Sequence, residues 1–196
     1  LPGDQLIGAR RYRIYGNYVR SEDDETTVRL ATIFFVDMTE MFNVRDEFLR
    51  TRPITAVILI DNYDELMSNL PDSTISKLDA QINEAVSGWV TGLHALCRKM
   101  ERNRYLLLFE SKDLSRLQEG KFSILDAIRA VVNPAGVNAT ISLGIGKDGS
   151  SFEENYSFAN LSIEMALSRG GDQAVIKDRY NFAFYGGRTK ETERRT

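Results

Sequence analysis

Residues 54–60 (ITAVILI) form a run that is apolar at every position except Thr55. A segment of this length without a polar face is typical of a strand buried on both faces of a sheet. The run follows Arg52 and Pro53, where proline removes a backbone donor and breaks the preceding pattern. We therefore expect a separate folded unit to begin near residue 53 and to bury this strand.

Helical and strand patterns alternate after this run. Apolar residues recur at three- and four-residue steps from Ile75 to Leu96, which predicts a long helix that starts near Pro71. The further expected elements are helices over 112–117, 121–132 and 152–168, and strands over 97–101, 104–110, 137–145 and 174–176. The order β-α-β-β-α-β with an extra terminal strand predicts an α+β, ferredoxin-like fold with an antiparallel sheet in two layers.

The residues before the break predict a smaller unit. Residues 10–20 alternate apolar and polar side chains, and residues 28–36 are rich in β-branched and aromatic residues, so both are expected to be strands. The acidic residues 21–25 would form the loop between them, and a helical pattern over 41–50 could be capped by Asp37 or Thr39. Two or three strands are not stable alone, so we expect this hairpin to end a larger sheet.

Composition narrows the range of functions. Hydrophobic residues make up 42% and charged residues 27% of the chain, as in soluble globular proteins. The net charge is −3 with acids and bases interleaved, which gives no reason to expect a nucleic-acid partner or membrane contact. Cys97 is the only cysteine, which excludes an internal disulfide and a Cys/His zinc cluster and favours the reducing cytoplasm. No apolar run reaches about 18 residues, and Leu1 in place of methionine suggests a fragment.

Particular strings then resemble a known domain family. SLGIG at residues 142–146 is similar to the strand before the last helix of GGDEF domains, and an alanine-rich helix follows it. The order of elements over about residues 52–178 matches that family too. Upstream, VDMTE at residues 36–40 resembles the closing strand of a PAS domain, of which only the last strands, a partial β-hairpin, would be present.

Four further strings narrow the resemblance: IDNYDEL at residues 60–66, RGGDQAVIK at 169–177, FYGG at 184–187 and the basic tail RTKETERRT. Together they resemble membrane-anchored cyclic-di-AMP phosphodiesterases of the GdpP/YybT type, ordered as transmembrane helices, PAS, degenerate GGDEF and DHH phosphoesterase. The resemblance implies a bacterial membrane protein with this part on the cytoplasmic side. It also implies four segments: PAS strands over 1–40, a linker helix over 41–52, a degenerate GGDEF domain over 53–178, and a strand and linker toward a DHH domain over 179–196.

The same resemblance implies that cyclase chemistry is lost. Active GGDEF domains join two nucleoside triphosphates with the help of two divalent ions, which carboxylates hold. The family's first aspartate falls on Leu59. Its hairpin signature falls on Glu101, Arg102, Asn103, Arg104 and Tyr105. A guanidinium in place of a metal-binding acid would repel the ion.

Two other parts of the family's site are also replaced. The phosphate-gripping lysine and arginine of the last helix fall on Leu167 and Gly171. The product-inhibition motif R-x-x-D falls on residues 92–95 (GLHA), so no cyclic-di-GMP binding is expected there. We therefore expect no catalytic residue, no metal site and no cyclase activity in this chain.

Polar residues near the end of the apolar strand leave open a remodelled nucleotide site. The junction of a strand and a helix is a usual place for phosphate chemistry. The candidate residues are Asp61, Asn62, Asn103, Arg104, Asp172 and Gln173. On this hypothesis the ligand is ATP with Mg²⁺. The alternative is that Asp61 and Asn62 form a turn or a helix cap and that Asp64 and Glu65 are solvated.

Other features favour structural roles. His94, the only histidine, is expected on the long helix, and without a partner Ser, Cys or second His it is interpreted as a packing or surface residue. Gly170 and Gly171 are expected to end the helix over 152–168, because glycine tolerates positive φ. Aromatic residues alternate over 180–185, which predicts either a strand of the same sheet or a docking surface. The tail from Arg188 is expected to be an exposed linker.

Three functional hypotheses follow. In the first, the chain is a regulatory domain that relays an input, through the helix over 41–50 and as a homodimer, to a DHH domain that hydrolyses cyclic-di-AMP with Mn²⁺. In the second, it is itself a weak ATPase. In the third, it is an inert dimerisation scaffold. Apart from ATP and Mg²⁺ on the second hypothesis, no cofactor is expected in this chain.

Overall fold

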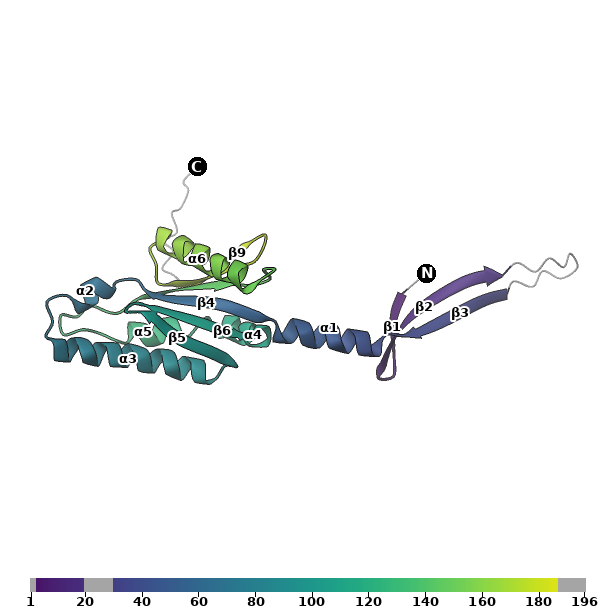
Figure 1. The fold of residues 1–196 in the computed structure, drawn as a ribbon, viewed down its shortest axis with the longest axis horizontal. Helices are drawn as coiled ribbons and strands as arrows, with labels where there is room; N and C mark the ends of the chain where they lie inside the picture. Colours follow the sequence, from purple (N-terminus) through teal and green to yellow (C-terminus); the bar gives the residue numbers. More distant parts are fainter. Residues whose placement is uncertain (1–2, 20–29, 187–196) are drawn as a thin grey trace, which may run out of the picture. The chain divides into compact units, whose positions relative to one another are not determined.

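The computed structural model describes residues 3–19 and 30–186, and the chain divides into two compact units, Leu1–Arg50 and Thr51–Thr196 (Figure 1). Two predicted segments, the acidic loop of residues 21–25 and the basic tail from Arg188, lie outside the described residues. Along the described part of the chain, no helix is both long and apolar enough to cross a membrane. The two units differ in how much apolar surface they bury.

The first unit is an antiparallel sheet in the order β1-β2-β3, followed by a helix. Its elements are β1 (Gly3–Ile7), β2 (Arg10–Val19), β3 (Leu30–Asp37) and α1 (Thr39–Thr51). The sequence patterns predict all of these except β1. The Asp37 carboxylate accepts a hydrogen bond from the Thr39 amide at 2.9 Å, so Asp37 supports the start of α1. In the described part of this unit, Phe42 is the one fully buried hydrophobic side chain, and Arg11 and Arg45 lie over its ring.

The second unit is a larger sheet in the order β5-β6-β4-β7-β8-β9. Its strands are β4 (Pro53–Ile60), β5 (Ala95–Glu101), β6 (Arg104–Glu110), β7 (Ile141–Gly146), β8 (Gln173–Lys177) and β9 (Phe182–Gly186). Its helices are α2 (Tyr63–Met67), α3 (Asp72–Thr91), α4 (Ser111–Glu119), α5 (Ile124–Arg129) and α6 (Phe152–Ser168). The order of β4 to β7 is the ferredoxin-like arrangement expected from the sequence, so the α+β fold class is confirmed.

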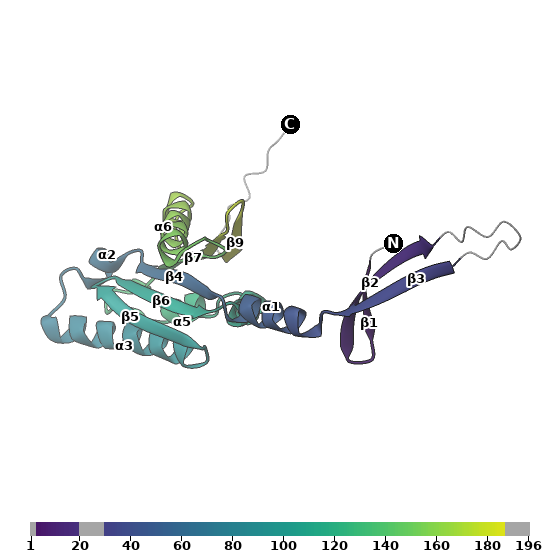
Figure 2. The ribbon, with the colours of Figure 1, turned by 45° about the vertical axis from the view of Figure 1, so that its right-hand side comes forward.

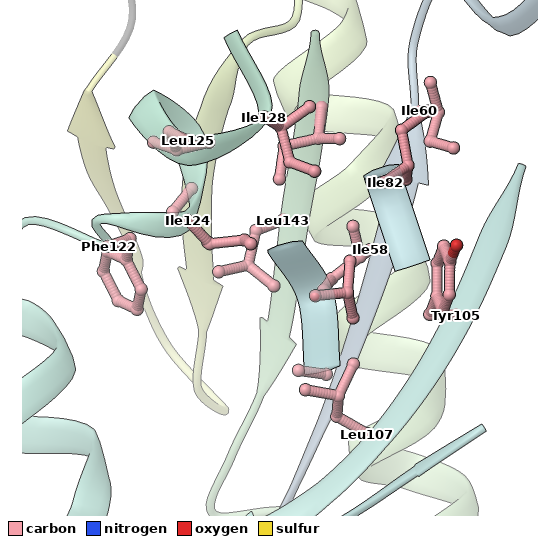
Figure 3. Packing of buried hydrophobic residues seen from close by; sticks show 14 of the residues in the cluster. Ile58, Ile60, Ile82, Tyr105, Leu107, Phe122, Ile124, Leu125, Ile128 and Leu143 are labelled. Carbon is pink, nitrogen blue, oxygen red and sulfur yellow. The ribbon is translucent and has the colours of Figure 1, made fainter. Parts of the chain in front are cut away.

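Helix α6 lies on the opposite face of the sheet from α3 and α5 (Figure 1, Figure 2), so the domain has three layers and the prediction of two is wrong. On one face, Ile58 and Ile60 of β4 join a large core cluster with α3, α4 and α5 (Figure 3). On the other face, Val57 packs against Ala159 and Ile163 of α6. Strand β4 is therefore buried on both faces, as its apolar run predicts.

Glycines in β7 allow α6 to approach the sheet closely. A Cβ on Gly144 would lie 2.2 Å from the carbonyl oxygen of Ala159, and a Cβ on Gly146 would lie 1.9 Å from that of Asn155. The helix backbone therefore packs directly on the strand, which is the physical reason for the third layer. Because α6 crosses between β7 and β8, these two strands run parallel, whereas the other described pairs of this sheet are antiparallel as predicted.

The long helix is shorter than its sequence pattern predicts. Helix α3 ends at Thr91, is followed by Gly92, and gives way to β5 at Ala95. The expected extension to residue 96 is therefore wrong, because the apolar residues after Gly92 belong to a turn and a strand. His94 consequently precedes a strand and does not lie on a helix, and its Nδ1 lies 3.2 Å from Oδ2 of Asp113.

Other boundaries near the candidate site also differ. The strand predicted from Val137 begins only at Ile141, because the Asn133 side chain accepts the Val137 amide at 2.9 Å and closes a turn. Helix α2 is not predicted from the sequence. Helix α6 spans the predicted residues, and Gly170 and Gly171 follow it with positive φ, as expected of a helix end. Strand β9 pairs with β8, so the aromatic alternation belongs to the domain's own sheet.

Candidate functional site

The end of β4 is the place where the GGDEF pattern requires its first metal-binding aspartate, and Leu59 stands there. Leu59 pairs in register with Arg104 of β6. Leu59 packs against the cluster of Val57 and α6, and the Arg104 guanidinium donates a hydrogen bond to Oδ1 of Asn160 on α6. An aliphatic group and a cation thus lie at the two positions to which the GGDEF resemblance assigns carboxylates. Within residues 3–19 and 30–186, no cluster of three or more His, Cys, Asp or Glu side chains could hold a metal ion.

The β5–β6 hairpin carries the other signature positions. Glu101 and Arg102 are exposed at its tip. The Asn103 carbonyl accepts a hydrogen bond from the Ile60 amide at 2.9 Å, which holds the hairpin beside the end of β4. Tyr105 is buried in the large core cluster, and burial raises the pKa of its hydroxyl. Asn103 and Tyr105 therefore contribute to the fold at this place.

Asp61 follows β4, and its carboxylate lies against the turn after α6. Its Oδ2 accepts a hydrogen bond from the Asp172 amide at 2.9 Å. A Cβ on Gly171 would lie 2.7 Å from this oxygen, so the contact needs glycine. The other oxygen, Oδ1, is buried without a hydrogen bond of normal geometry among the described residues. Burial raises the pKa of Asp61, and the Asp172 amide and Ser142 oppose this shift.

Asn62 connects β4 to the segment before β7. Its Nδ2 donates to the Asn138 carbonyl at 2.9 Å, and its Oδ1 accepts the Thr140 amide at 3.1 Å. Asn62 precedes α2, but its side chain makes no capping hydrogen bond to that helix. Asp61 and Asn62 form a turn and Asn62 stands at the N-cap position of α2, as the structural alternative expects, while its side chain joins two loops.

Asp172 and Gln173 lie where the chain enters β8. The Asp172 carboxylate accepts hydrogen bonds from Nε of Arg129 at 2.8 and 2.7 Å, one to each oxygen. Gln173 is buried, and its Nε2 donates to the Ala166 carbonyl at 3.0 Å. Together with Asp61, these residues form a polar network that joins the end of β4, the end of α5 and the start of β8.

Two of the pockets in this domain lie at the turn after α6 and at the β5–β6 hairpin. The glycine-turn pocket has a volume of about 450 Å³ and is lined by Arg129, Asn138, Thr140, Arg169, Gly170, Gly171 and Asp172. The hairpin pocket has a volume of about 680 Å³, and its lining includes Tyr63, Asp72, Asp79, Lys99, Glu101 and Arg102. Asp172 of the predicted site lines the glycine-turn pocket, whereas none of the six predicted residues lines the hairpin pocket.

The six predicted nucleotide-binding residues are divided among different contacts. Asp172 lines the glycine-turn pocket, Arg104 binds α6, and Gln173 is buried. Sequence reasoning missed Arg129 and Arg169, which line the same pocket as Asp172. Arg169 could have been noticed because it stands directly before the glycine pair, whereas nothing in the sequence links Arg129 to it. Nucleotide binding by any of these residues stays a prediction.

Comparison with known proteins identifies the family to which the domain is similar. Residues 58–184 match the family described as the GGDEF domain of GdpP-like cyclic-di-AMP phosphodiesterases. The chain is 33% identical over 165 residues to the cyclic-di-AMP phosphodiesterase GdpP of Bacillus subtilis, covering 84% of the chain and 25% of that protein. It is 32% identical over 165 residues to the cyclic-di-AMP phosphodiesterase PdeA of Listeria monocytogenes, with the same coverage of 84% and 25%. The chain thus spans about a quarter of the length of these curated relatives.

Solved structures share the fold. The active GGEEF domain of a diguanylate cyclase from Vibrio cholerae superposes with a TM-score of 0.55 at 12% sequence identity. The match covers 68% of this chain and 88% of that domain. At this identity the likeness concerns the fold alone, and it agrees with the ferredoxin-like arrangement of β4 to β7.

Proposed function

This chain belongs to the family of GdpP-like GGDEF domains of cyclic-di-AMP phosphodiesterases, and on that premise we propose that it is a regulatory domain that makes no cyclic dinucleotide itself. One observation carries the proposal: Leu59 and Arg104 face each other across β4 and β6, where the active family requires carboxylates. Asp61, Asn62 and Gln173 make hydrogen bonds to other parts of the domain.

The missing carboxylates matter because of the reaction's charge. Attack of a 3′-hydroxyl on an α-phosphate needs divalent ions that neutralise the triphosphate and polarise the reacting oxygens. Hard cations require several convergent oxygen ligands. The guanidinium of Arg104 repels such an ion, and the aliphatic side chain of Leu59 offers it no ligand. The hydrogen bond from Arg104 to Asn160 of α6 further holds the guanidinium at this place.

The first test measures condensation directly. The purified chain is incubated with GTP and Mn²⁺, and the products are separated by chromatography, with an active diguanylate cyclase as the positive control. We expect no cyclic dimer above the blank reaction. Formation of cyclic-di-GMP that scales with the concentration of this chain would overturn the proposal.

The second part of the proposal concerns a longer protein. We propose that this domain transmits an input from a PAS domain through α1 to a DHH phosphodiesterase domain that uses Mn²⁺. That protein would be a homodimer in the bacterial cell membrane, with this part on the cytoplasmic side. Support comes from the names of the relatives and from the short sheet of the first unit, whose β3 exposes Ile33, Phe34, Phe35 and Val36.

An in-frame deletion of residues 54–178 from the longer protein tests the relay. If the domain regulates, the deletion should change the rate of cyclic-di-AMP hydrolysis or abolish its response to the sensor. A flexible linker of matched span serves as the control for spacing. Unchanged hydrolysis and response in the deletion variant would instead favour the inert dimerisation scaffold.

Weak ATP hydrolysis is kept as a second candidate because of the hairpin pocket. Its volume of about 680 Å³ lies in the range of small-molecule sites, and Tyr63 and Arg102 offer a ring and a guanidinium, whereas Lys99 is paired with Asp79. Calorimetric titration with ATP and Mg²⁺ tests this function. Arg102→Ala should weaken binding if the pocket is used, whereas Asp61→Ala, which removes a contact to β8, should act mainly on stability.

A further inference from the structure

The two faces of β9 differ in what covers them. On one face, the ring of Tyr185 meets that of Phe122 edge-on at 5.2 Å between centroids, and its hydroxyl accepts a hydrogen bond from Gln118. On the other face, the rings of Phe182 and Phe184 stack with their centroids 6.5 Å apart. Phe184 is 40% exposed. The core of the domain therefore covers one face of β9 and leaves aromatic rings partly in solvent on the other.

Helix α6 runs beside this open face of β9 (Figure 2). Residues at steps of three or four lie along one side of a helix. The side of α6 toward β9 carries Phe158, Leu161, Met165 and, at the C-cap, Arg169. Leu161 is 43% exposed, so this row extends the apolar area of the strand. We call this row, together with Lys177, Phe182 and Phe184, the α6–β9 surface.

Two cations lie on the rings of this surface. Nζ of Lys177 lies 4.9 Å from the ring centroid of Phe158 and 4.6 Å from that of Phe182, so it joins α6 to β9. The guanidinium carbon of Arg169 lies 4.5 Å from the ring centroid of Phe184. A guanidinium stacked on a ring keeps its N–H edge free to donate. The surface thus combines aromatic area with donors that a second molecule can reach.

The acids that flank these cations in the sequence have other partners. The Asp172 carboxylate is bound by Arg129, and that of Asp178 accepts two backbone amides of the β8–β9 turn. Within the described residues, neither Arg169 nor Lys177 forms an ion pair with a carboxylate, although Asp178 offsets part of the charge of Lys177. Arg169 is therefore the group that an acid from outside the domain can pair with.

We propose that the α6–β9 surface is where the phosphodiesterase part of the longer protein docks on this domain, an inference that rests on the proposed function. The family match ends at residue 184, inside β9, and the chain spans about a quarter of its curated relatives. In the proposed order of domains, the phosphodiesterase part is thus attached just beyond this strand. Such a tether gives an effective concentration on the order of millimolar, so a modest patch is sufficient for contact.

The surface also defines the chemistry of its partner. Aliphatic or aromatic side chains of the partner would pack on Phe182 and Phe184, and a carboxylate would meet Arg169. Strand β9 is an edge of the described sheet, so its outer backbone groups are open to the partner as well. With its other side α6 packs on Val57 of β4, the strand that follows α1 in the chain. Docking here therefore gives α6 a contact with both the input side and the output side of the relay.

The test uses the longer protein with the photo-reactive residue benzoylphenylalanine in place of Phe184. After illumination and digestion, cross-linked peptides are identified by mass spectrometry, and we expect peptides of the phosphodiesterase part of the same chain. The same residue in place of Tyr156 is the matched control. Tyr156 is 41% exposed and lies four residues before Asn160, on the side of α6 that Arg104 contacts. No cross-link to the phosphodiesterase part is expected from that position.

A charge reversal and a measurement on the unsubstituted protein complete the test. Arg169→Glu should lower the yield of the cross-link from position 184 about tenfold or more, because a like charge then meets the acid of the partner. Arg98→Glu, at an exposed position of the opposite edge strand β5, should leave the yield unchanged. Amides of residues 182–186 should exchange hydrogen more slowly in the longer protein than in this chain. That comparison decides even if Arg169→Glu does not fold.

Several results would overturn the proposal. Cross-links from position 184 only to a second copy would assign the surface to a homodimer, and equal cross-links from positions 156 and 184 would indicate non-specific proximity. Unchanged hydrogen exchange without any cross-link would show that the surface stays open. The deletion of residues 54–178 reports regulation and not contact. Altered regulation without cross-links therefore contradicts this inference alone, whereas cross-links with unchanged hydrolysis contradict the relay alone.

Discussion

Two corners of the domain at the end of β4 differ in the charged side chains that they contain. At the first corner, Leu59 and Arg104 face each other and contribute no carboxylate. At the second, Asp61 contacts the Asp172 amide, and the Asp172 carboxylate is paired with Arg129. One residue separates Leu59 from Asp61, yet the first corner has no carboxylate and the second has two, both partly buried.

The difference teaches which charges a fold can keep without a bound ion. Two facing carboxylates at the first corner would repel each other unless a divalent cation lay between them. At the second corner Arg129 compensates the charge of Asp172 whether or not a ligand is present. Asp61 has only the Asp172 amide as a partner, and burial still raises its pKa. The domain therefore keeps carboxylates where amides and guanidinium groups meet them, and it lacks them where only a metal could.

The largest effect on stability is expected from adding a side chain to Gly171 at the second corner. In Gly171→Ala the new Cβ would lie 2.7 Å from Oδ2 of Asp61, and the residue would keep a φ of 71°. We expect a loss of about 2–3 kcal/mol in the free energy of unfolding, from left-handed strain of about 1–2 kcal/mol and a lost hydrogen bond of about 1 kcal/mol. Urea unfolding followed by circular dichroism measures it.

Gly170→Ala is the matched control for this prediction. Its φ is also positive, at 99°, but a Cβ there meets nothing within 4 Å. Only the strain of about 1–2 kcal/mol is then expected. Equal losses in the two variants would mean that the contact with Asp61 contributes nothing, and the contrast between the corners would lose its energetic basis.

Placing acids at the first corner should create a site that binds a divalent cation. The double substitution Leu59→Asp with Arg104→Glu places two carboxylates opposite each other on β4 and β6. We expect Mn²⁺ binding at least about tenfold tighter than in the control, which corresponds to about 1.4 kcal/mol. Quenching of the Mn²⁺ resonance signal in electron paramagnetic resonance measures the affinity.

The isosteric pair Leu59→Asn with Arg104→Gln is the control for that experiment, since it has similar shape without charge. Thermal unfolding of both variants shows whether the corner still folds. If the two variants bind Mn²⁺ equally, the carboxylates are not sufficient ligands at this place. The loss of metal binding would then have to be ascribed to further oxygen ligands that this chain lacks.

The first corner could be predicted almost entirely from the sequence. Its residues lie in a strand and a hairpin with strong local patterns, and their identity alone shows that the acids are absent. Helix α6 is also predicted over residues 152–168, and in the structure Oγ of the preceding Ser151 accepts the Glu154 amide. Local chemistry of this kind is present in the sequence itself.

The second corner could not be predicted in the same way. Asp61 meets an amide 111 residues further along the chain, and Asp172 meets an arginine 43 residues before it. These distances in sequence are closed only because α6 lies on the second face of the sheet and returns the chain parallel to β7. The two-layer prediction missed that crossover, so Arg129 and Arg169 could not be connected with the site.

The pH dependence of stability tests the smallest difference between the corners. Burial raises the pKa of Asp61 above its unfolded value of 3.8, so the folded state holds the proton more tightly than the unfolded state. The stability contributed by Asp61 is therefore present at acid pH and is lost as the pH rises through the folded pKa, with a slope below about 1.4 kcal/mol per pH unit. Asp61→Asn cannot titrate, so its free energy of unfolding relative to the wild type should increase from pH 4 to pH 7. Asp64→Asn, at an exposed position three residues on, is the control. A relative stability that instead decreases with pH would mean that the fold stabilises the ionised form of Asp61. The hydrogen bonds to its carboxylate would then outweigh the effect of burial on its pKa.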